Sequence, residues 1–388
     1  MSNNPLVSII IPVYNGSNFV CEAIDSALAQ TYENCEIIVV NDGSTDDTEQ
    51  ACLSYGDKIR YYSKENGGVA TALNLAISKM HGDYFSWLSH DDIYYPNKVG
   101  LQIEALKSCG EMSRITFGDY ANLDQETGVI TLRKLDSMYS KEQLNDSVFS
   151  VLKGHVGGCS LLIHKSHFER VGVFNESQRY TNDYDLWFRI MRNQECLYIN
   201  HPLFISRVHK RQSGQVHVSR FLDEQVMLAK CFYRSLTEDE IRRFYNNKFL
   251  FLYDLYCGYR IYETSNKSFD FEIADAVKEC NVESRICSVV GSKKVFIFGA
   301  GYNGKSVYFL LKFANISCAG FLDSNSLLHG TTIIDGIKCF SLDEIKAFSG
   351  DIFCIVSPIA LQGIKKQLNT IGVKDLIYKH DLEQVLRS

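Results

Sequence analysis

The sequence predicts an α/β protein with mostly parallel sheets and at least two domains. In the first hundred residues, short runs of β-branched side chains alternate with amphipathic stretches, and the same alternation returns after Lys293. The length of 388 residues also exceeds one ordinary domain of roughly 100 to 200 residues. We therefore expect an α/β domain over residues 1–217, a helical connector over 218–290 and a smaller α/β domain over 291–388.

Four strands are predicted in the first hundred residues. The second has a continuous apolar run, which is typical of a central parallel strand buried on both faces. Polar residues follow the first, second and fourth strands, so these strands carry side chains to one edge of the sheet. The four strands are expected at Val7–Pro12, Cys35–Asp42, Ile59–Ser63 and residues 83–89.

Helices are predicted between these strands. The segment Gly43–Asp47 starts the second helix, with Ser44 or Thr45 as its N-cap. The third helix follows the turn at residues 66–68 and runs to about Met80. The first helix has an apolar face made of Phe19, Ala23, Ile24, Ala27 and Leu28.

Beyond residue 110 the pattern changes twice. Residues 110–215 are less regular, with short strands near Ile115–Gly118, Ser160–Ile163 and Leu197–Ile199, and residues 218–290 are helical in pattern and rich in aromatic side chains. Further strands at the spacing of strand–helix–strand units are expected at 293–298, 318–323, 351–357 and 375–379.

Composition excludes several classes of protein. The hydrophobic fraction of 45% with five prolines is that of a packed globular protein, and the net charge of −6 argues against a nucleic-acid binder. The thirteen cysteines are scattered without a Cys-x-x-Cys pair, so we expect reduced thiols and a cytoplasmic protein. The most apolar stretch, Lys248–Tyr262, is interrupted by Asp254 and Arg260 and is too short to span a membrane.

The polar residues after the strands form a candidate ligand site. In open α/β sheets, ligands bind beyond the carboxyl ends of the strands, where the strand order reverses. There Asp42 would accept from a base N–H or a ribose hydroxyl, and Mg²⁺ or Mn²⁺ at Asp91 would neutralise a diphosphate. The alternative is that these residues only form turns and caps. The set expected at this edge is Pro12, Tyr14, Asn15, Asp42, Asp91 and Asp92.

Four segments of residues 5–215 resemble, in order, the sequence blocks of the family 2 glycosyltransferases. They are VSIIIPVYNGSNFVCEAIDSALAQTY, EIIVVNDGSTDDT, ENGGVATALNLAI and GDYFSWLSHDDIYYPNKV. The resemblance implies the GT-A fold and a nucleoside-diphosphate sugar donor, with UDP as the expected nucleotide. It also implies that Asp42, Asn66 and Gly67 contact the donor and that Asp91 binds the metal.

Two positions depart from the family pattern. Ser89 stands where many members have the first aspartate of the Asp-x-Asp motif, and Leu73 stands where many have arginine. Ser89 leaves one carboxylate fewer for the metal, so we expect Asp92, His209 and the substrate diphosphate to share that role. Asp92 then remains either a supporting residue or a helix cap.

The segment Tyr180–Ile190 is similar to the family block that carries the general base. The resemblance places this base at Asp183, near the N-terminal end of a predicted helix, where a carboxylate stays ionised and oriented. A helix cap is the alternative for Asp183, and Asp185 is the fallback base. Arg207 and His209 resemble a segment near the leaving group, so Arg207 is expected at the diphosphate and His209 at the metal or phosphate.

The C-terminal segment predicts a Rossmann-like nucleotide-binding turn. Gly299, Gly301 and Gly304 follow a predicted strand in the Gly-x-Gly-x-x-Gly pattern, and Asp323 closes the next strand at the spacing of a ribose-binding acid. NAD(P) or another nucleotide is one reading of this turn, and a purely structural domain is the other.

The resemblance implies an inverting glycosyltransferase of surface polysaccharide synthesis, making lipopolysaccharide O-antigen or capsule on a glycan or lipid-linked acceptor. Two alternatives stay open: a non-catalytic nucleotide-sugar-binding scaffold and a bifunctional enzyme that uses NAD(P) in its C-terminal domain. The aromatic connector could pack on the catalytic domain, on the inner face of a membrane as a peripheral contact, or on a second subunit of a homodimer.

Overall fold

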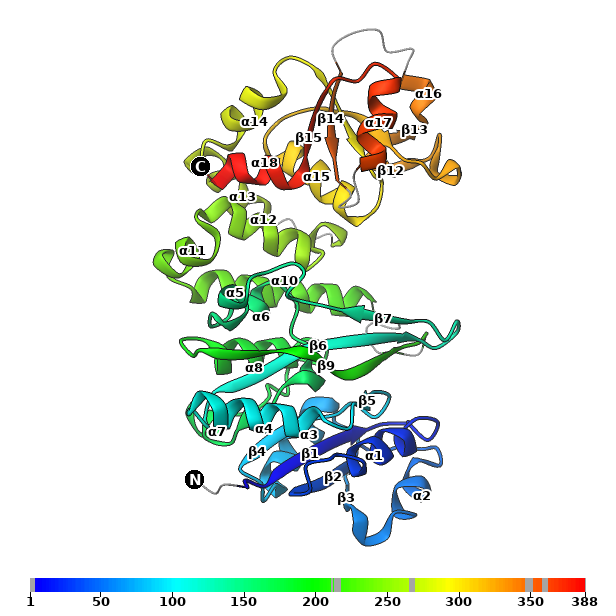
Figure 1. Cartoon of the computed structure of the whole chain (residues 1–388), viewed down its shortest axis with the longest axis vertical. Coiled ribbons are helices and arrows are strands. Elements are labelled where there is room, and N and C mark those ends of the chain that lie inside the picture. The colour runs from blue at the N-terminus through cyan, green and yellow to red at the C-terminus, as the bar shows by residue number, and fades with distance from the viewer. Residues whose placement is uncertain are drawn as a thin grey trace. The chain divides into compact units, whose positions relative to one another are not determined.

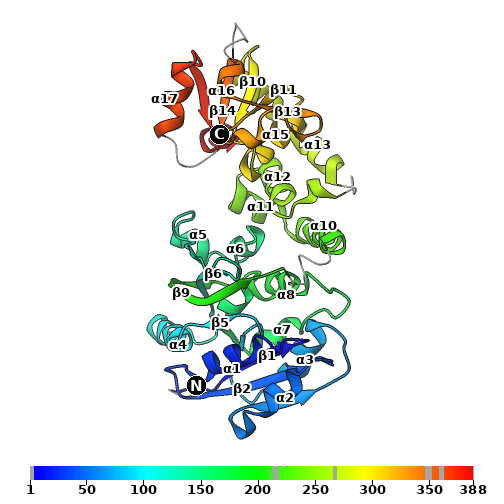
Figure 2. The same ribbon diagram turned by 90° about the vertical axis from the view of Figure 1, so that its right-hand side faces the viewer.

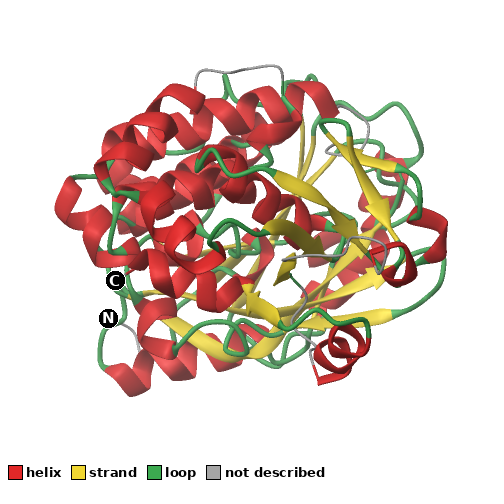
Figure 3. Ribbon diagram, turned by 90° about the horizontal axis from the view of Figure 1, so that it is seen from above, coloured by secondary structure: helices red, strands yellow, loops and turns green. Residues whose placement is uncertain are grey.

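The computed structural model describes residues 4–210, 212, 218–264, 269–345, 352–357 and 362–387. Contacts within the chain divide it into two compact units, Met1–Phe232 and Tyr233–Ser388. The structure contains both helices and strands, as the predicted α/β class requires (Figure 3). The expected boundary at residue 217 lies outside the described residues, and the three-part division of the chain stays a prediction.

The first sheet of unit 1 is mostly parallel and has its first strand near the centre (Figure 1). Ile9 lies beside Ile37 on one neighbouring strand and beside Ser86 on the other. The order β3-β2-β1-β4-β8 reverses direction at β1, and only β8 runs antiparallel. The four predicted strands are confirmed. The strands are β1 (Val7–Val13), β2 (Cys35–Asn41), β3 (Arg60–Ser63), β4 (Tyr84–Trp87) and β8 (Ile163–His164).

Helices pack against this sheet because their apolar faces bury the apolar side chains of its strands. Ala23 and Ile24 of the first helix join a buried core with Ile9 and Ile11 of β1. Figure 2 shows this helix against β1 and β2. The helices are α1 (Val20–Leu28), α2 (Thr48–Leu53), α3 (Val69–Lys79) and α4 (Lys98–Cys109).

Two details of the predicted helices are wrong. Leu28 is 39% exposed, because it ends α1 where the helix leaves the sheet. The second helix starts at Thr48 rather than after Ser44, since the hydroxyl of Ser44 accepts the N–H of Asn15 and Asp46 accepts from Thr48. The loop before α2 is therefore shaped by contacts with the loop after β1.

A second sheet of unit 1 has the order β5-β9-β6-β7. Its central strands β6 and β9 are parallel and much longer than predicted, because a bulge after Gly118 lets the ladder continue through a polar stretch. The strands are β5 (Ile93–Tyr94), β6 (Ile115–Asp124), β7 (Ile130–Arg133) and β9 (Cys196–Val208). The associated helices are α5 (Lys141–Asn145), α6 (Phe149–Leu152), α7 (Ser166–Val171) and α8 (Asn182–Met191).

Helix α10 (Val218–Ser235) carries the chain from the first unit into the second. Its buried side includes Leu222, Val226 and Ala229. Within unit 1, the ring of Phe232 stacks on Phe188 of α8 with ring centroids 4.5 Å apart. The C-terminal end of this helix therefore packs on the helix that carries Asp183.

Unit 2 begins with helices and continues into a sheet of order β12-β13-β11-β10-β14-β15. All its strand pairs are parallel except the hairpin β12–β13, whose turn residues Asp335 and Gly336 have φ of 48° and 80°. An Asp-Gly pair suits such a turn, but no strand was predicted there. The strands are β10 (Lys294–Phe298), β11 (Cys318–Leu322), β12 (Thr332–Ile334), β13 (Ile337–Phe340), β14 (Ile352–Val356) and β15 (Asp375–Tyr378).

The helices of unit 2 bury the aromatic residues of the predicted connector. Most of α12 is buried, which explains its apolar sequence, and in the described part of the chain no helix is long and apolar enough to cross a membrane. All thirteen cysteines are free thiols. The helices are α11 (Glu238–Tyr245), α12 (Lys248–Gly258), α13 (Asp270–Glu279), α14 (Val282–Val290), α15 (Tyr302–Phe313), α16 (Leu342–Ile345), α17 (Gln362–Thr370) and α18 (Lys379–Arg387).

Candidate active site

A pocket of about 820 Å³ opens in unit 1 at the carboxyl ends of β1, β2 and β4. This volume suits a ligand of nucleotide-sugar size. The edge is the one at which the strand order reverses, as the sequence predicts. Of the residues predicted for the site, the pocket is lined by Pro12, Tyr14, Asn15, Asp42, Asn66, Asp91, Asp92, Asp183 and His209.

Asp91 and His209 form the pair predicted to hold a metal. The Asp91 Oδ2 and His209 Nε2 atoms are 3.1 Å apart, and both side chains are 15% exposed. Two ligands in adjacent positions around a cation with bonds of about 2.1 Å are separated by about 3 Å, so this pair fits one Mg²⁺ or Mn²⁺. Among the described residues no third His, Cys, Asp or Glu completes the group. The remaining positions would fall to substrate phosphate and water, which is usual for such hard cations.

Asp92 is buried, and its carboxylate is held from two sides. Its Oδ1 accepts the backbone N–H of Arg207 at 2.9 Å, and its Oδ2 accepts from the thiol of Cys159 at 3.4 Å. Burial, with the charge of Asp91 nearby, raises the pKa of Asp92. Ser89 is also held by Cys159, since the thiol contacts both its N–H and its hydroxyl. These bonds show Asp92 as a support of the loop, which is the role the sequence left open for it.

Arg207 lies behind the same loop rather than in the lining of the pocket. The side chain is buried, its Nε donates to the carbonyl oxygen of Asp91 at 2.9 Å, and its other nitrogens bond Gln125 and Glu22. The guanidinium also stacks over Phe19, with Cζ 4.5 Å from the ring centroid. Its predicted contact with a diphosphate stays a prediction. The contacts present give Arg207 the task of holding the Asp91 backbone in place.

Asp42 holds the glycine turn that follows β3. Its Oδ1 accepts the N–H of Gly67 at 3.0 Å, its Oδ2 accepts the N–H of Gly68 at 2.7 Å, and Lys64 forms an ion pair with it at 2.7 Å. Position 68 requires glycine because its backbone φ is 96°, which other residues rarely adopt. Gly67 itself does not line the pocket, whereas Gly68 and Asn66 do. Asp42 thus shapes the turn as well as lining the pocket.

The loop after β1 is tied to the loop after β2. Asn15 has a φ of 49°, which asparagine tolerates better than most residues, and its side-chain oxygen accepts the N–H of Thr45 at 2.8 Å. Tyr14 is 47% exposed at the rim of the pocket. The loops after β1 and β2, both predicted to bind the donor, are therefore joined to each other by hydrogen bonds.

Asp183 lies in the first turn of α8 and faces the pocket. Its Oδ1 accepts the N–H of Tyr184 at 2.8 Å. Burial raises the pKa of Asp183 to about 6, so burial outweighs the stabilisation of its charge by the helix terminus. A carboxylate with this pKa is a suitable proton acceptor near neutral pH.

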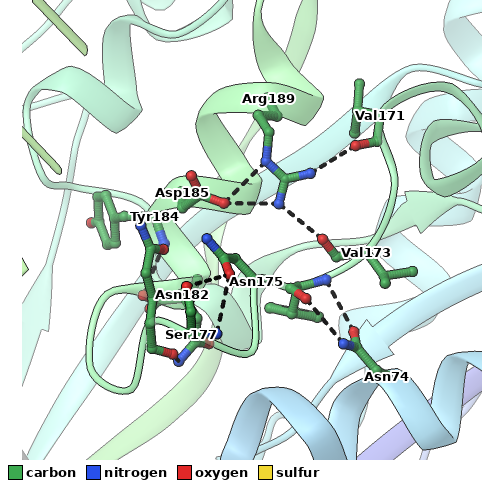
Figure 4. Close-up of polar contacts among 12 residues, drawn as sticks. Asn74, Val171, Val173, Asn175, Ser177, Asn182, Tyr184, Asp185 and Arg189 are labelled. Atoms are coloured by element: carbon green, nitrogen blue, oxygen red, sulfur yellow. Dashed lines mark hydrogen bonds and ion pairs between the residues drawn. The ribbon is translucent and has the colours of Figure 1, made fainter. Parts of the chain in front are cut away.

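Asp185, the fallback base, is occupied elsewhere. Figure 4 shows it paired with Arg189 one turn further along α8, at 2.8 Å. The same arginine donates to the carbonyl oxygens of Val171 and Val173 at 2.8 and 2.9 Å. Asp185 is absent from the lining of the pocket, so of these two aspartates only Asp183 lines it.

The structure adds pocket residues that sequence reasoning did not select. Arg179 and Tyr180 line the pocket from the turn just before α8, and Trp87 lines it from β4. Their signal was adjacency, because Tyr180 begins the block that contains Asp183 and Arg179 directly precedes it. Without a structure, an exposed arginine in a turn has no distinguishing pattern.

The glycine turn of unit 2 is present after β10, at the start of α15. Gly304 packs so closely that a Cβ there would lie 1.7 Å from the carbonyl oxygen of Gly299, whereas a Cβ on Gly301 would meet open space. Both carboxylate oxygens of Asp323 accept backbone hydrogen bonds, from the N–H groups of Ala300 and Asn325 at 2.8 and 2.9 Å. The predicted ligand site at this turn, for NAD(P) or another nucleotide, stays a prediction.

Comparison with known proteins supports the fold of unit 1. The crystal structure of residues 1–349 of TarS from S. aureus, in complex with UDP-GlcNAc, superimposes with a TM-score of 0.55 at 14% identity, covering 74% of this chain and 86% of that one. At this identity the likeness concerns the fold alone. The predicted α/β class with a GT-A domain is thereby confirmed.

Sequence comparisons cover both units. A model described as C2185-like, N-terminal matches residues 291–376, and the model of glycosyl transferase family 2 matches residues 8–171. An uncharacterized glycosyltransferase of Rickettsia felis is 49% identical over 250 residues, which are 64% of this chain and 41% of that protein. Another, from Rickettsia typhi, is 48% identical over 252 residues, which are 65% of this chain and 79% of that protein. With this similarity over 65% of its length and 79% of the relative's, the chain belongs to glycosyl transferase family 2.

Proposed function

We propose that this protein transfers a sugar from a nucleoside diphosphate to an acceptor hydroxyl, with inversion at the anomeric carbon. The observation that carries the proposal is one pocket lined by both Asp183 and the Asp91–His209 pair. A proton acceptor and a site for a cation at the leaving group are the two functions that such a displacement needs.

The reaction would be a single displacement. The acceptor oxygen forms a bond to the anomeric carbon as the bond from that carbon to the diphosphate oxygen breaks. Asp183 takes the proton of the acceptor hydroxyl, and the nucleoside diphosphate leaves with the electron pair. Asp91 and His209 would hold Mg²⁺ or Mn²⁺, which neutralises negative charge on the diphosphate when bound. A positioned base such as Asp183 typically contributes about 10²- to 10⁴-fold in rate.

A thermal-shift screen tests the donor class. UDP-, GDP- and dTDP-sugars, with and without Mn²⁺, would be compared on the native chain and on Asp91→Ala. Asp83→Ala is the matched control, because Asp83 precedes the same strand β4 at its opposite end and its carboxylate forms a surface ion pair with Lys165. We expect stabilisation that depends on Mn²⁺, persists in the control and is lost in Asp91→Ala. Stabilisation by no nucleotide sugar would refute the proposal.

Stereochemistry and biological role form the finer part of the proposal. We place the enzyme in the cytoplasm, acting on a glycan or lipid-linked acceptor for O-antigen or capsule, with UDP as the first donor nucleotide to try. Proton NMR of the first product formed would show the anomeric configuration opposite to that of the donor. Retained configuration would exclude the single displacement.

One observation favours a second candidate, a non-catalytic nucleotide-sugar binder. The hydroxyl of Ser89 contacts the thiol of Cys159, so this residue does not add a charged ligand to Asp91 and His209. For such a binder, Mn²⁺ would leave nucleotide affinity unchanged and the donor would not be hydrolysed. The same screen, followed by an assay for released nucleoside diphosphate, separates the two functions.

A further inference from the structure

The turn that precedes α8 is held by a carboxylate from α10. Glu224 accepts three successive backbone N–H groups, with Oε1 3.0 Å from the nitrogen of Arg179 and Oε2 2.7 and 3.1 Å from those of Tyr180 and Thr181. The hydroxyl of Thr181 donates to Oε2 as well, at 3.3 Å. Hydrogen bonds to an ionised acceptor are the stronger ones, and three on one carboxylate fix the path of this short segment.

The chain leading into this turn is also fixed from the opposite side. Figure 4 shows Asn74 of α3 beside the segment that follows α7. The side-chain amide of Asn74 donates to the carbonyl oxygen of Phe174 at 3.0 Å, and its oxygen accepts the N–H of Phe174 at 3.0 Å. Arg179 therefore stands on a segment held by α3 at one end and by α10 at the other.

The charges around the pocket are unbalanced without a ligand. Four aspartates line it, whereas Arg179 is the one lysine or arginine among the described lining residues. The nearby cations are engaged, because Lys64 pairs with Asp42 and Arg207 with Glu22. In the described part of the chain, no residue accepts a hydrogen bond from the exposed guanidinium of Arg179.

This guanidinium lies over the glycine turn at the nucleotide end of the pocket. The Cζ atom of Arg179 is 3.9 Å from the point that a Cβ on Gly68 would occupy, so the guanidinium lies within van der Waals distance of the turn. Gly68 in turn donates its N–H to Asp42 at 2.7 Å. A planar guanidinium matches the geometry of phosphate oxygens and binds them with two parallel hydrogen bonds.

We propose that Arg179 binds the diphosphate of the donor and that Glu224 is the positioning residue that places it. This inference rests on the proposed function, since it assumes a nucleoside diphosphate in the pocket. The position over Gly68, rather than deeper toward the acceptor side, assigns the contact to the donor. Glu224 acts through the backbone, so its effect on binding requires the Arg179 side chain.

Calorimetric titration of the full chain tests the phosphate contact. UDP, GDP and dTDP would each be compared with the corresponding nucleoside, in the presence of Mn²⁺, for the native chain, Arg179→Gln and Arg179→Lys. Arg133→Gln on the exposed strand β7 is the control. We expect Arg179→Gln to weaken diphosphate binding about 10- to 100-fold and nucleoside binding less than twofold, with partial recovery in Arg179→Lys.

A double-mutant cycle tests the role of Glu224. Glu224→Gln alone is expected to weaken diphosphate binding about 3- to 10-fold, and the double variant with Arg179→Gln should bind no worse than Arg179→Gln alone. Purely additive effects would show that Glu224 only stabilises the fold, and would overturn the positioning role.

The possible failures are distinguishable. If the native chain binds no nucleoside diphosphate, the proposed function fails. If the native chain binds one and Arg179→Gln binds it equally well, the function stands and the assignment of Arg179 is overturned. Unchanged diphosphate affinity with a raised KM for the acceptor would also overturn it, because the contact would then belong to the acceptor.

Discussion

Replacing Asp183 by asparagine should increase stability while it removes activity. Burial raises the pKa of Asp183 from 3.8 to about 6, a shift of about 2 units, and each unit corresponds to about 1.4 kcal/mol. The folded state binds this proton more tightly than the unfolded state, so stability falls as the pH rises from about 4 to 6. Above pH 6 the ionised carboxylate therefore lowers the free energy of unfolding by up to about 3 kcal/mol.

Asparagine keeps the shape and the oxygen that accepts the N–H of Tyr184, but carries no charge. At pH 7.5 we expect Asp183→Asn to gain up to about 3 kcal/mol in free energy of unfolding, and at pH 4 to match the native chain. Its kcat should fall about 10²- to 10⁴-fold. For the native enzyme, kcat/KM should rise with pH along a limb with an apparent pKa of about 6.

The two tryptophans of the chain make this measurement selective. Trp87 and Trp187 both lie in unit 1, with ring centroids 6.3 Å apart, so urea unfolding followed by their fluorescence reports the unit that contains Asp183. Asp185→Asn is the control. It loses the ion pair with Arg189 and should be destabilised by about 1 kcal/mol at pH 7.5. Equal destabilisation of Asp183→Asn at pH 4 and pH 7.5 would refute the reasoning, because it would mean that burial does not penalise the charge.

Four further substitutions, one of them a control, test the supports of the two units and the glycine turn of the pocket. Gly304→Ala should destabilise unit 2 by about 3 kcal/mol, because the new methyl group meets a carbonyl oxygen at 1.7 Å. Gly301→Ala should change stability by less than about 0.5 kcal/mol. Calorimetry of both variants measures the difference, and equal melting temperatures would contradict it. Arg207→Met should lower the free energy of unfolding of unit 1 by about 3 kcal/mol, because it removes the hydrogen bonds that the buried guanidinium makes behind the pocket. Unchanged urea unfolding, followed by tryptophan fluorescence, would show that these bonds contribute little. Asp42→Asn should weaken UDP binding about 10-fold, since an amide has one acceptor oxygen where the carboxylate uses two on the glycine turn, and a titration with unchanged affinity would argue against that turn as part of the donor site.

The sequence predicted the parts of the fold that depend on local pattern. Strand β1 is predicted correctly because its seven residues are all buried and all except Ser8 are apolar. The candidate loops followed from this, since each comes directly after a strand of a parallel sheet. The prediction was incomplete where a strand is polar, as in the second half of β6 beyond its bulge at Gly118. It was also wrong where a loop is shaped by another loop, as before α2.

The role of each charged side chain was less predictable than its position. The contact of Arg207 with a diphosphate stays a prediction, and no local pattern indicated that its guanidinium donates to the carbonyl oxygen of Asp91, 116 residues away in sequence. The sequence does not distinguish Glu224, because a glutamate in an amphipathic helix has no local signature. Its three backbone partners lie about 45 residues earlier in the chain.

The sequence by itself determined the α/β class and the edge of the sheet at which the pocket lies, which follow from periodicity and from adjacency along the chain. The choice of Asp42, Asp91 and Asp183 as candidate carboxylates rests on the resemblance to the family blocks. The tertiary structure alone decided which charges are already engaged: Lys64, Arg207 and Asp185 have partners, and Arg179 faces the pocket. The physical reason is that an ion pair or a buried hydrogen bond depends on distances between segments far apart in sequence, which no local pattern encodes.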